Sequence, residues 1–382
     1  METMQPVLKS GRDVWDQVNM PKSEFLLRVK KIKKEMKKRG IHALLLYGHG
    51  QNDYGNPCYV SNYLIKKLRG GMAAITEKGE VTLFARIGSR DVDYEKITTW
   101  VEDVRSCDDV SRECVAYLKE KNLLSSTIGF VGLQQFMPNY QLQYLSAALE
   151  QGHIVDADHI IRDMRMLKSP RECDQIRRSA RIVAHVIGLI ANNLFPNSNE
   201  MILGAFIDRD ARLEGAEDVR ILMAKPKDAP WAFRPPEDLP MAPGDRVIIY
   251  IAVEYERYWS EAVRTFAVKD SFIEEIKSEK TEALYGELLD GIKTGKPVSE
   301  FCEEARAKIE GSEVDYIPEY GFGQGIGLSL QEFPLISEVE ESLLREGMCL
   351  TLRLAVQDKA MGAVMAGNTI HLTKEGPEVL TD

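Results

Sequence analysis

The feature that most constrains the fold is a set of three patterned segments in the second half of the chain. Residues 242–266 predict two strands joined by a turn, because apolar residues fill both arms of the segment. Residues 321–334 are rich in glycine, which permits close backbone approach on both sides of Gln324. Residues 345–357 predict a turn followed by a strand that leads on to residues 368–381. Each segment alone is common, but their order and spacing together indicate one kind of domain.

The composition indicates an ordinary globular protein. The chain has 382 residues, of which 44% are apolar and 28% are charged. Since a domain takes about 150 residues, we expect two or three domains. Lys and Arg number 49 against 59 Asp and Glu, and this net charge of −10 argues against a protein that binds nucleic acid by neutralising phosphates. The amino-terminal residues lack the apolar region of a signal peptide, and no apolar run is long enough to span a membrane. We therefore expect a cytoplasmic protein with neither nucleic-acid nor membrane partners.

The cysteines and histidines are scattered along the sequence. The six cysteines form no CxxC pair and no dense framework, so we expect free thiols in a reducing cytoplasm, with cysteine-bound zinc and disulfides disfavoured. Of the six histidines, only His371 lies beyond residue 185.

The hydrophobic pattern divides the chain near residue 160. Before that point, strand patterns alternate with helix patterns, as is typical of an α/β domain. The expected elements there are a helix over 22–40, a strand over 42–48, a hairpin over 70–86, a helix near 110–120 and a strand over 126–133. After it we expect a long helical stretch from about 158 to 193, a helix from 199, strands over 246–268, and helices over 271–293 and 297–310. The prediction is an α/β (α+β) chain with two domains, residues 1–160 and 161–382.

Together with residues 167–183, the three segments resemble the pita-bread family of aminopeptidase P, methionine aminopeptidase and creatinase. The motifs that carry this resemblance are GD at 244–245, RTF at 264–266, GIG at 325–327, EFP at 332–334, EGM at 346–348 and EGPEVLT at 375–381. The resemblance implies a creatinase/prolidase-type amino-terminal domain followed by a pita-bread domain of catalytic type.

The resemblance also implies a site for two divalent metal ions, held by two Asp, one His and two Glu. Carried over position by position, these five ligands become Tyr250, Glu261, Gln324, Arg353 and Gly367. A single Glu with a Gln and an Arg is a poor set of metal ligands, because the guanidinium places a permanent positive charge where the ions would lie. We therefore expect no metal and no other cofactor at this site.

The family's substrate-handling histidines are also replaced, by Trp231 and by Gln331. The resulting prediction is a metal-independent hydrolase of the creatinase type, not a peptidase. It would cleave a C–N bond in a small carboxylated molecule. An aromatic or cyclic group in that molecule would suit the predicted pocket. A pseudoenzyme that binds a small ligand or a protein partner remains an alternative, as does a lyase or isomerase that uses the same acid and base groups.

The candidate site residues follow from these substitutions. Glu261 and Glu332 would transfer protons, and His371, the one imidazole of the second domain, is a further catalytic candidate. The candidates for substrate binding are Arg353, Tyr250, Gln324, Gln331, Trp231, Tyr258, Phe322 and Arg69. Arg353 would bind a substrate carboxylate, while the alternative is a buried salt bridge between Arg353 and Glu261 that only fills the place of the metal ions.

Arg69 is a candidate because the resemblance also implies a homodimer. In creatinase-like dimers, the amino-terminal domain sends an aromatic and a basic residue into the neighbouring subunit's site. Tyr63, Lys67 and Arg69 lie in the corresponding stretch, and the alternative is a solvated basic turn.

Overall fold

The computed structural model describes residues 15–50, 53–65, 69–149, 152–192, 199–226, 232–270, 272–359 and 361–382. The chain forms two compact units that divide between Arg165 and Met166. No helix in these described ranges combines the length and the apolar character that crossing a membrane requires.

The first unit is built on a mixed sheet, and six of its strands lie in the described part of the chain in the order β4-β3-β2-β1-β5-β6. The hairpin predicted over 70–86 is β2 and β3, with Gly79 at the turn in the left-handed region. β1 lies between antiparallel β2 and parallel β5. The strand bounds are β1 Ala43–His49, β2 Gly70–Thr76, β3 Val81–Ala85, β4 Asp103–Ser106, β5 Thr127–Val131 and β6 His153–Asp156.

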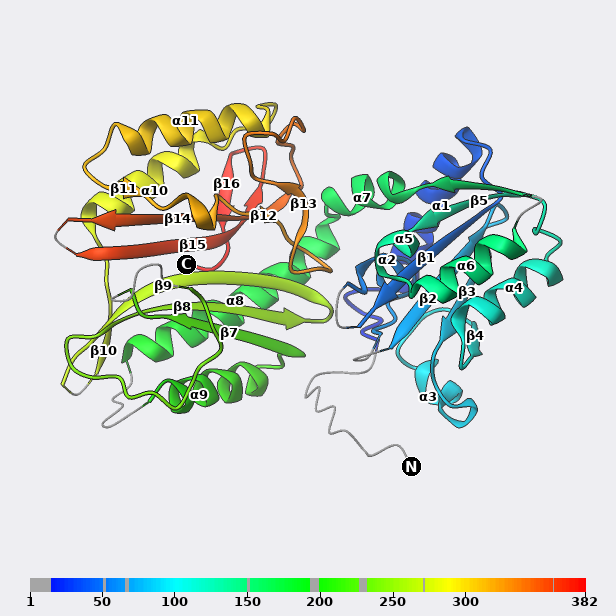
Figure 1. Cartoon of the computed structure of the whole chain (residues 1–382), viewed down its shortest axis with the longest axis horizontal. Helices are drawn as coiled ribbons and strands as arrows, with labels where there is room; N and C mark the ends of the chain where they lie inside the picture. Colours follow the sequence, from blue (N-terminus) through cyan, green and yellow to red (C-terminus); the bar gives the residue numbers. More distant parts are fainter. Residues whose placement is uncertain are drawn as a thin grey trace. The chain divides into compact units, whose positions relative to one another are not determined.

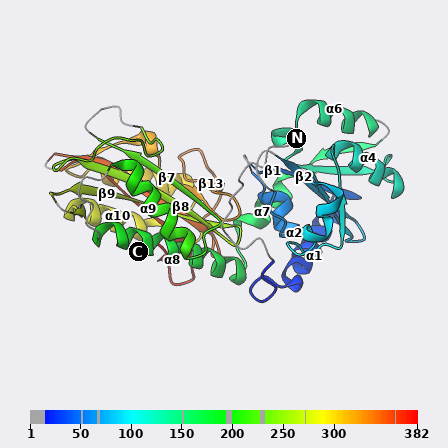
Figure 2. The same ribbon diagram turned by 90° about the horizontal axis from the view of Figure 1, so that it is seen from below.

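Helices cover both faces of this sheet, with α1 and α2 on one side and α4 and α6 on the other (Figure 2). The predicted first helix is α1, and Gly40 follows its end in the left-handed conformation. Asp109 caps α4 by accepting hydrogen bonds from the backbone N–H groups of Ser111 and Arg112. The helices are α1 Lys22–Lys38, α2 Gly55–Ser61, α3 Val92–Glu95, α4 Val110–Glu120, α5 Leu133–Phe136, α6 Asn139–Ala148 and α7 Asp158–Met166, with a 3₁₀ turn over Ser89–Asp91.

The second unit is built on a larger sheet, whose main path among the described residues is β13-β12-β14-β15-β9-β8-β7. Neighbouring strands along this path are antiparallel. The short strands β10, β11 and β16 pair with β9, β14 and β15 respectively. The bounds are β7 Asp218–Ala224, β8 Arg246–Tyr255, β9 Tyr258–Val268, β10 Ile273–Glu275, β11 Asp315–Tyr316, β12 Gln324–Gly325, β13 Glu332–Leu335, β14 Cys349–Asp358, β15 Gly362–Leu372 and β16 Pro377–Val379.

Two pairs of helices bury the two halves of this sheet (Figure 1). α8 (Pro170–Asn192) and α9 (Glu200–Leu213) pack on β7, β8 and β9. α10 (Glu279–Gly291) and α11 (Val298–Glu310) pack on the half that contains β14 and β15. The structure therefore confirms the predicted fold, an α/β creatinase-like domain followed by a pita-bread domain.

Two predicted helices differ from the structure for local reasons. The stretch from 158 to 193 is two helices, because Pro170 cannot continue a preceding helix but fits the first position of α8. The helix predicted over 271–293 begins only at Glu279. Its first part is β10, in which Ile273 is buried and pairs with Val268 of β9. Sheet pairing therefore overrides the local pattern there.

The glycine-rich segment supports a first prediction about stability. Gly323 has a φ of +129°, and a Cβ atom there would lie 2.0 Å from the Thr351 carbonyl oxygen. We expect Gly323→Ala to lower the free energy of unfolding by at least about 2 kcal/mol, measured by urea denaturation. Gly286→Ala is the control, because Gly286 lies within α10 with open space around it, and it should stabilise by about 0.5–1 kcal/mol. Equal stability of the two variants would contradict the close backbone approach.

Candidate active site

The centre of the candidate site is Glu261 on β9, whose side chain binds two others from the same sheet. Glu261 is 2% exposed. One carboxylate oxygen, Oε2, accepts a hydrogen bond of 2.6 Å from the Tyr250 hydroxyl. The other, Oε1, accepts hydrogen bonds from Nε of Arg353, at 2.9 Å, and from Nη2 of Arg353. The structure thus places three predicted site residues in direct contact.

Sheet register explains why these side chains meet. Tyr250 of β8 lies opposite Val263 of β9, so Glu261 is the diagonal neighbour of Tyr250 on the same face. Arg353 of β14 lies opposite Gly367 of β15, and Gly367 in turn lies opposite Val263. A Cβ atom on Gly367 would come within 3.0 Å of the Arg353 side chain. The missing side chain at 367 therefore leaves room for Arg353 to cross β15 and reach Glu261.

Burial and charge fix the ionisation of this cluster. Burial, together with the neighbouring Glu261 carboxylate, raises the pKa of Tyr250 well above its usual value, so the phenol stays protonated and donates. Burial alone would lower the pKa of Arg353, but the Glu261 carboxylate outweighs that effect and the pKa is raised. The site therefore holds an arginine–glutamate ion pair with a tyrosine hydroxyl on the carboxylate.

These residues do not fit the pair of divalent metal ions that the resemblance implies. Of the five positions, only Glu261 offers a carboxylate, and both of its oxygens are already bound by Arg353 and Tyr250. Gln324 donates its side-chain N–H to the Leu330 carbonyl, and Gly367 has no side chain. A guanidinium has no lone pair to give a metal, and its charge repels a cation. No reaction step can be assigned to metal ions held by these five residues.

Glu332 belongs to a second buried ion pair. Its Oε2 lies 3.1 Å from Nζ of Lys168, and both side chains are almost fully buried. Its Oε1 accepts a hydrogen bond from the backbone N–H of Ser329. Gly327 leaves space for this carboxylate, because a Cβ atom there would lie 2.9 Å from it. Sequence reasoning missed Lys168, which lies between α7 and α8 and about 160 residues before its partner.

The remaining candidates of the second unit lie in different surroundings. The Tyr258 hydroxyl donates to Glu172 at 3.2 Å, and both residues are buried. Phe322 packs in the core, stacked on Tyr316 with ring centroids 5.3 Å apart. Gln331 is exposed. Trp231 lies outside the described residues.

Arg69 lies in the first unit just before β2, where its carbonyl accepts the N–H of Gly50. Tyr63 of the same stretch is buried, and Lys67 lies outside the described residues.

His371 lies on β15 beside two cysteines that sequence reasoning treated only as free thiols. The six cysteines are free, as expected from the sequence, and the structure shows that all six are buried. Nε2 of His371 lies 3.4 Å from the Cys173 sulfur, and Cys349 is the cross-strand neighbour of His371. The sequence contains no short-range signal for this group, because its members lie on α8, β14 and β15.

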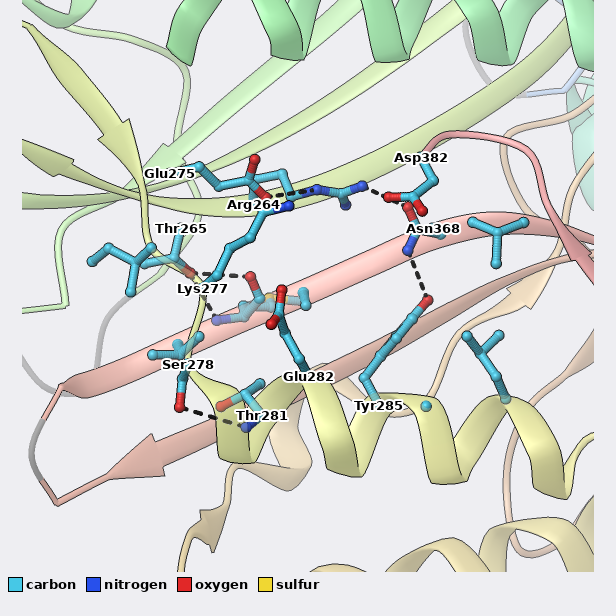
Figure 3. Close-up of a pocket in the computed structure, with 17 residues that line it drawn as sticks. Arg264, Thr265, Glu275, Lys277, Ser278, Thr281, Glu282, Tyr285, Asn368 and Asp382 are labelled. Carbon is cyan, nitrogen blue, oxygen red and sulfur yellow. Dashed lines mark hydrogen bonds and ion pairs between the residues drawn. The ribbon is translucent and has the colours of Figure 1, made fainter.

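A pocket of about 230 Å³ opens elsewhere on the second unit, between α10 and the strands β9 and β15 (Figure 3). Its polar side chains bind one another. Arg264 donates to Asn368 and pairs with Glu275, and Asn368 donates to the Tyr285 hydroxyl. Arg264 also donates to the Thr381 carbonyl, so these contacts anchor the end of the chain to the sheet.

Comparison with known proteins defines the class to which this fold and site belong. Residues 174–374 match the metallopeptidase family M24, and residues 28–167 match the creatinase/prolidase amino-terminal domain. The Xaa-Pro dipeptidase of Pyrococcus horikoshii is 26% identical over 371 residues, covering 93% of this chain and 96% of that protein.

Solved structures show the same two-domain fold. The prolidase from Pyrococcus horikoshii superposes with a TM-score of 0.73 at 24% identity, covering 93% of this chain and 98% of that one. The X-Pro aminopeptidase from Thermotoga maritima gives a TM-score of 0.76 at 20% identity, covering 93% of this chain and 97% of that one. The chain belongs to the metallopeptidase family M24.

These relatives overturn the function expected from the sequence. The substitutions at the metal positions led to the prediction of a creatinase-type hydrolase that is metal-independent and not a peptidase. That prediction is wrong, because the relatives that match along the whole chain are named dipeptidases and prolidases. The error came from judging function by a few site positions. The similarity to dipeptidases and prolidases extends over both units of the chain.

The buried ion pair yields a second prediction. We expect Arg353→Met to lower the free energy of unfolding by about 3–5 kcal/mol, because it leaves the Glu261 carboxylate buried without its cation. The double variant Arg353→Met/Glu261→Gln should lose at least about 1 kcal/mol less than the sum of the two single losses. Urea denaturation of all four proteins measures this coupling.

The control for this cycle is an exposed ion pair of the same unit. Lys269 and Glu274 lie 3.2 Å apart with side chains about half exposed, so Lys269→Met should cost less than about 1 kcal/mol. Strict additivity of the Arg353 and Glu261 variants would show that the two side chains do not depend on each other.

Proposed function

We propose that this chain takes short peptides with a Xaa-Pro bond as its ligands. The observation that carries the proposal is the match to the Xaa-Pro dipeptidase of Pyrococcus horikoshii across 93% of this chain and 96% of that protein. A match of that extent includes both units and the strands that carry Tyr250, Glu261 and Arg353. The family relation thus supports a substrate class that the site residues alone did not indicate.

The surroundings of Tyr250 suit a prolyl ring. Phe233 lies beside Tyr250, with ring centroids 6.1 Å apart, and the rings of Phe233 and Tyr320 lie 5.6 Å apart. All three rings are only partly buried and pack on a small apolar cluster of the sheet. An aromatic surface of this kind binds a compact apolar ring through the hydrophobic effect. We propose that the proline side of the peptide packs there, near the Arg353–Glu261 pair.

The third prediction tests the ligand class directly. Ala-Pro and Leu-Pro at millimolar concentration should raise the melting temperature of the protein, because ligands that bind only the folded state stabilise it. Pro-Ala and Ala-Ala are the control peptides, since they lack a Xaa-Pro bond, and should not stabilise. Proline released into the same samples, with and without added Mn²⁺, reports cleavage. Equal effects of all four peptides, or none from any, would contradict the proposal.

A matched pair of variants tests the aromatic surface. Phe233→Ala should weaken Ala-Pro binding at least tenfold in isothermal titration, because it removes one of the rings that we propose to contact proline. Tyr144→Ala is the control, as Tyr144 is an exposed aromatic residue on α6 of the first unit. Unchanged binding by the Phe233 variant would place the ligand elsewhere.

We further propose that the chain works as a cytoplasmic homodimer, with Arg69 of one subunit near the site of the other. The support is the family layout for the dimer, and the six free buried cysteines for a reducing compartment. Light scattering coupled to size-exclusion chromatography tests the dimer, which requires twice the 43.1 kDa mass of one chain.

A further inference from the structure

Three side chains with soft or borderline donor atoms meet where the start of α8 packs on the sheet. They are Cys173 of α8, Cys349 of β14 and His371 of β15. One donor atom from each, the two sulfurs and a ring nitrogen, lies within 4.8 Å of the other two. The two strand residues are directly opposite each other in the β14–β15 ladder, and the helix supplies the third group from above them. The backbone of three packed elements therefore holds the group together.

The spacing of these atoms is close to what a tetrahedral metal site requires. Zinc binds cysteine sulfur at about 2.3 Å and histidine nitrogen at about 2.0–2.1 Å, so neighbouring ligand atoms lie roughly 3.5–3.8 Å apart. The Cys173 sulfur lies 3.4 Å from Nε2 of His371. All three donor atoms lie within 4.8 Å of one another, so a bound ion would require them to approach by about 1 Å at most.

The residues around His371 match the support that metal-binding histidines usually have. A ligating imidazole typically contacts a carboxylate through its other ring nitrogen, which orients the ring. Here Nδ1 of His371 lies 3.3 Å from Oε2 of Glu378. Arg177 binds the same carboxylate at 2.7 Å and lies 3.2 Å from Nδ1. Arg177 also pairs with Asp174 at 3.2 Å, so its charge is shared between two carboxylates. Two thiolates would balance the charge of a dication bound here.

The environment also favours a thiolate. Cys173 lies in the first turn of α8, where the helix dipole stabilises negative charge. Cys349, on the strand below, is fully buried.

We propose that Cys173, Cys349 and His371 bind one zinc-class divalent ion, with the fourth position open to water or to an added ligand. Two sulfurs and one imidazole suit Zn²⁺, whereas Mg²⁺, Ca²⁺ and Mn²⁺ prefer oxygen donors. Binding releases every proton held on the two sulfurs and on Nε2 of His371, so that the ion is held by two thiolates and an unprotonated ring nitrogen. The site uses none of the five positions at which the family resemblance places metal ions, and it does not depend on the proposed peptide ligand.

The last prediction tests this site with metal alone. The reduced, chelator-treated protein is titrated with Zn²⁺ against a chromophoric chelator, and separately with Co²⁺, whose bonds to thiolates give charge-transfer absorption. We expect one equivalent of each metal per chain. His371→Gln and Cys173→Ser should weaken Zn²⁺ binding at least tenfold and reduce the Co²⁺ absorption. Glu378→Gln should weaken binding about 10–100-fold, because it removes the carboxylate that orients His371.

The control is Cys302→Ser, which removes another buried thiol of the same unit, in α11. It should bind Zn²⁺ as the unmodified protein does. Because a buried cysteine variant can unfold, the variants of the partly buried His371 and the exposed Glu378 carry the test, with circular dichroism as the check on folding. Zinc affinity in these two variants equal to that of the Cys302 variant would overturn the proposal. A reduced wild-type protein that binds no Zn²⁺ would overturn it as well.

Discussion

The ion pair between Arg353 and Glu261 is the constraint on which the candidate site depends. It joins strands β14 and β9 across β15, and it exists because Gly367 leaves the space that Arg353 crosses. Tyr250 completes the carboxylate's hydrogen bonding from β8. The opposite charge and the hydrogen bonds offset much of the free-energy cost of removing this carboxylate from water. Each of the three side chains therefore requires the others. Three strands, β8, β9 and β14, are therefore linked by a buried polar cluster, and β15 lies between β9 and β14.

That cluster also gives this chain a donor set that differs from the two Asp, one His and two Glu that the family resemblance implies. The family fold is present in full, but the donor set at the five positions is a guanidinium, an amide, a phenol, a glycine and one carboxylate that is already paired. A different group of donors, Cys173, Cys349 and His371, meets at another place in the same unit. Sulfur ligands favour zinc, whereas oxygen ligands favour Mg²⁺, Ca²⁺ and Mn²⁺. A metal ion bound by this group would therefore differ from one bound by a set of carboxylates.

Much of the fold was predictable because its signals are local. The apolar periodicity of residues 22–38, the turn at Gly79 and the paired strands over 246–268 each appear in the structure near the predicted bounds. The pairing of Glu261 with Arg353 was also one of two alternatives that the substitutions suggested. The Lys168–Glu332 pair and the Cys173 group could not be predicted, because their members lie far apart in sequence and meet only through packing.

The sequence by itself determined the order of elements, the family resemblance and the loss of the expected metal ligands, because these depend on residue identity and short-range pattern. Only the tertiary structure decided which charges are paired, that β10 replaces the start of a helix, and which thiols lie beside His371. The physical reason is that strand register and helix packing set distances between distant residues. Hydrogen bonds and ion pairs depend on distances of a few ångströms, which a linear pattern does not specify.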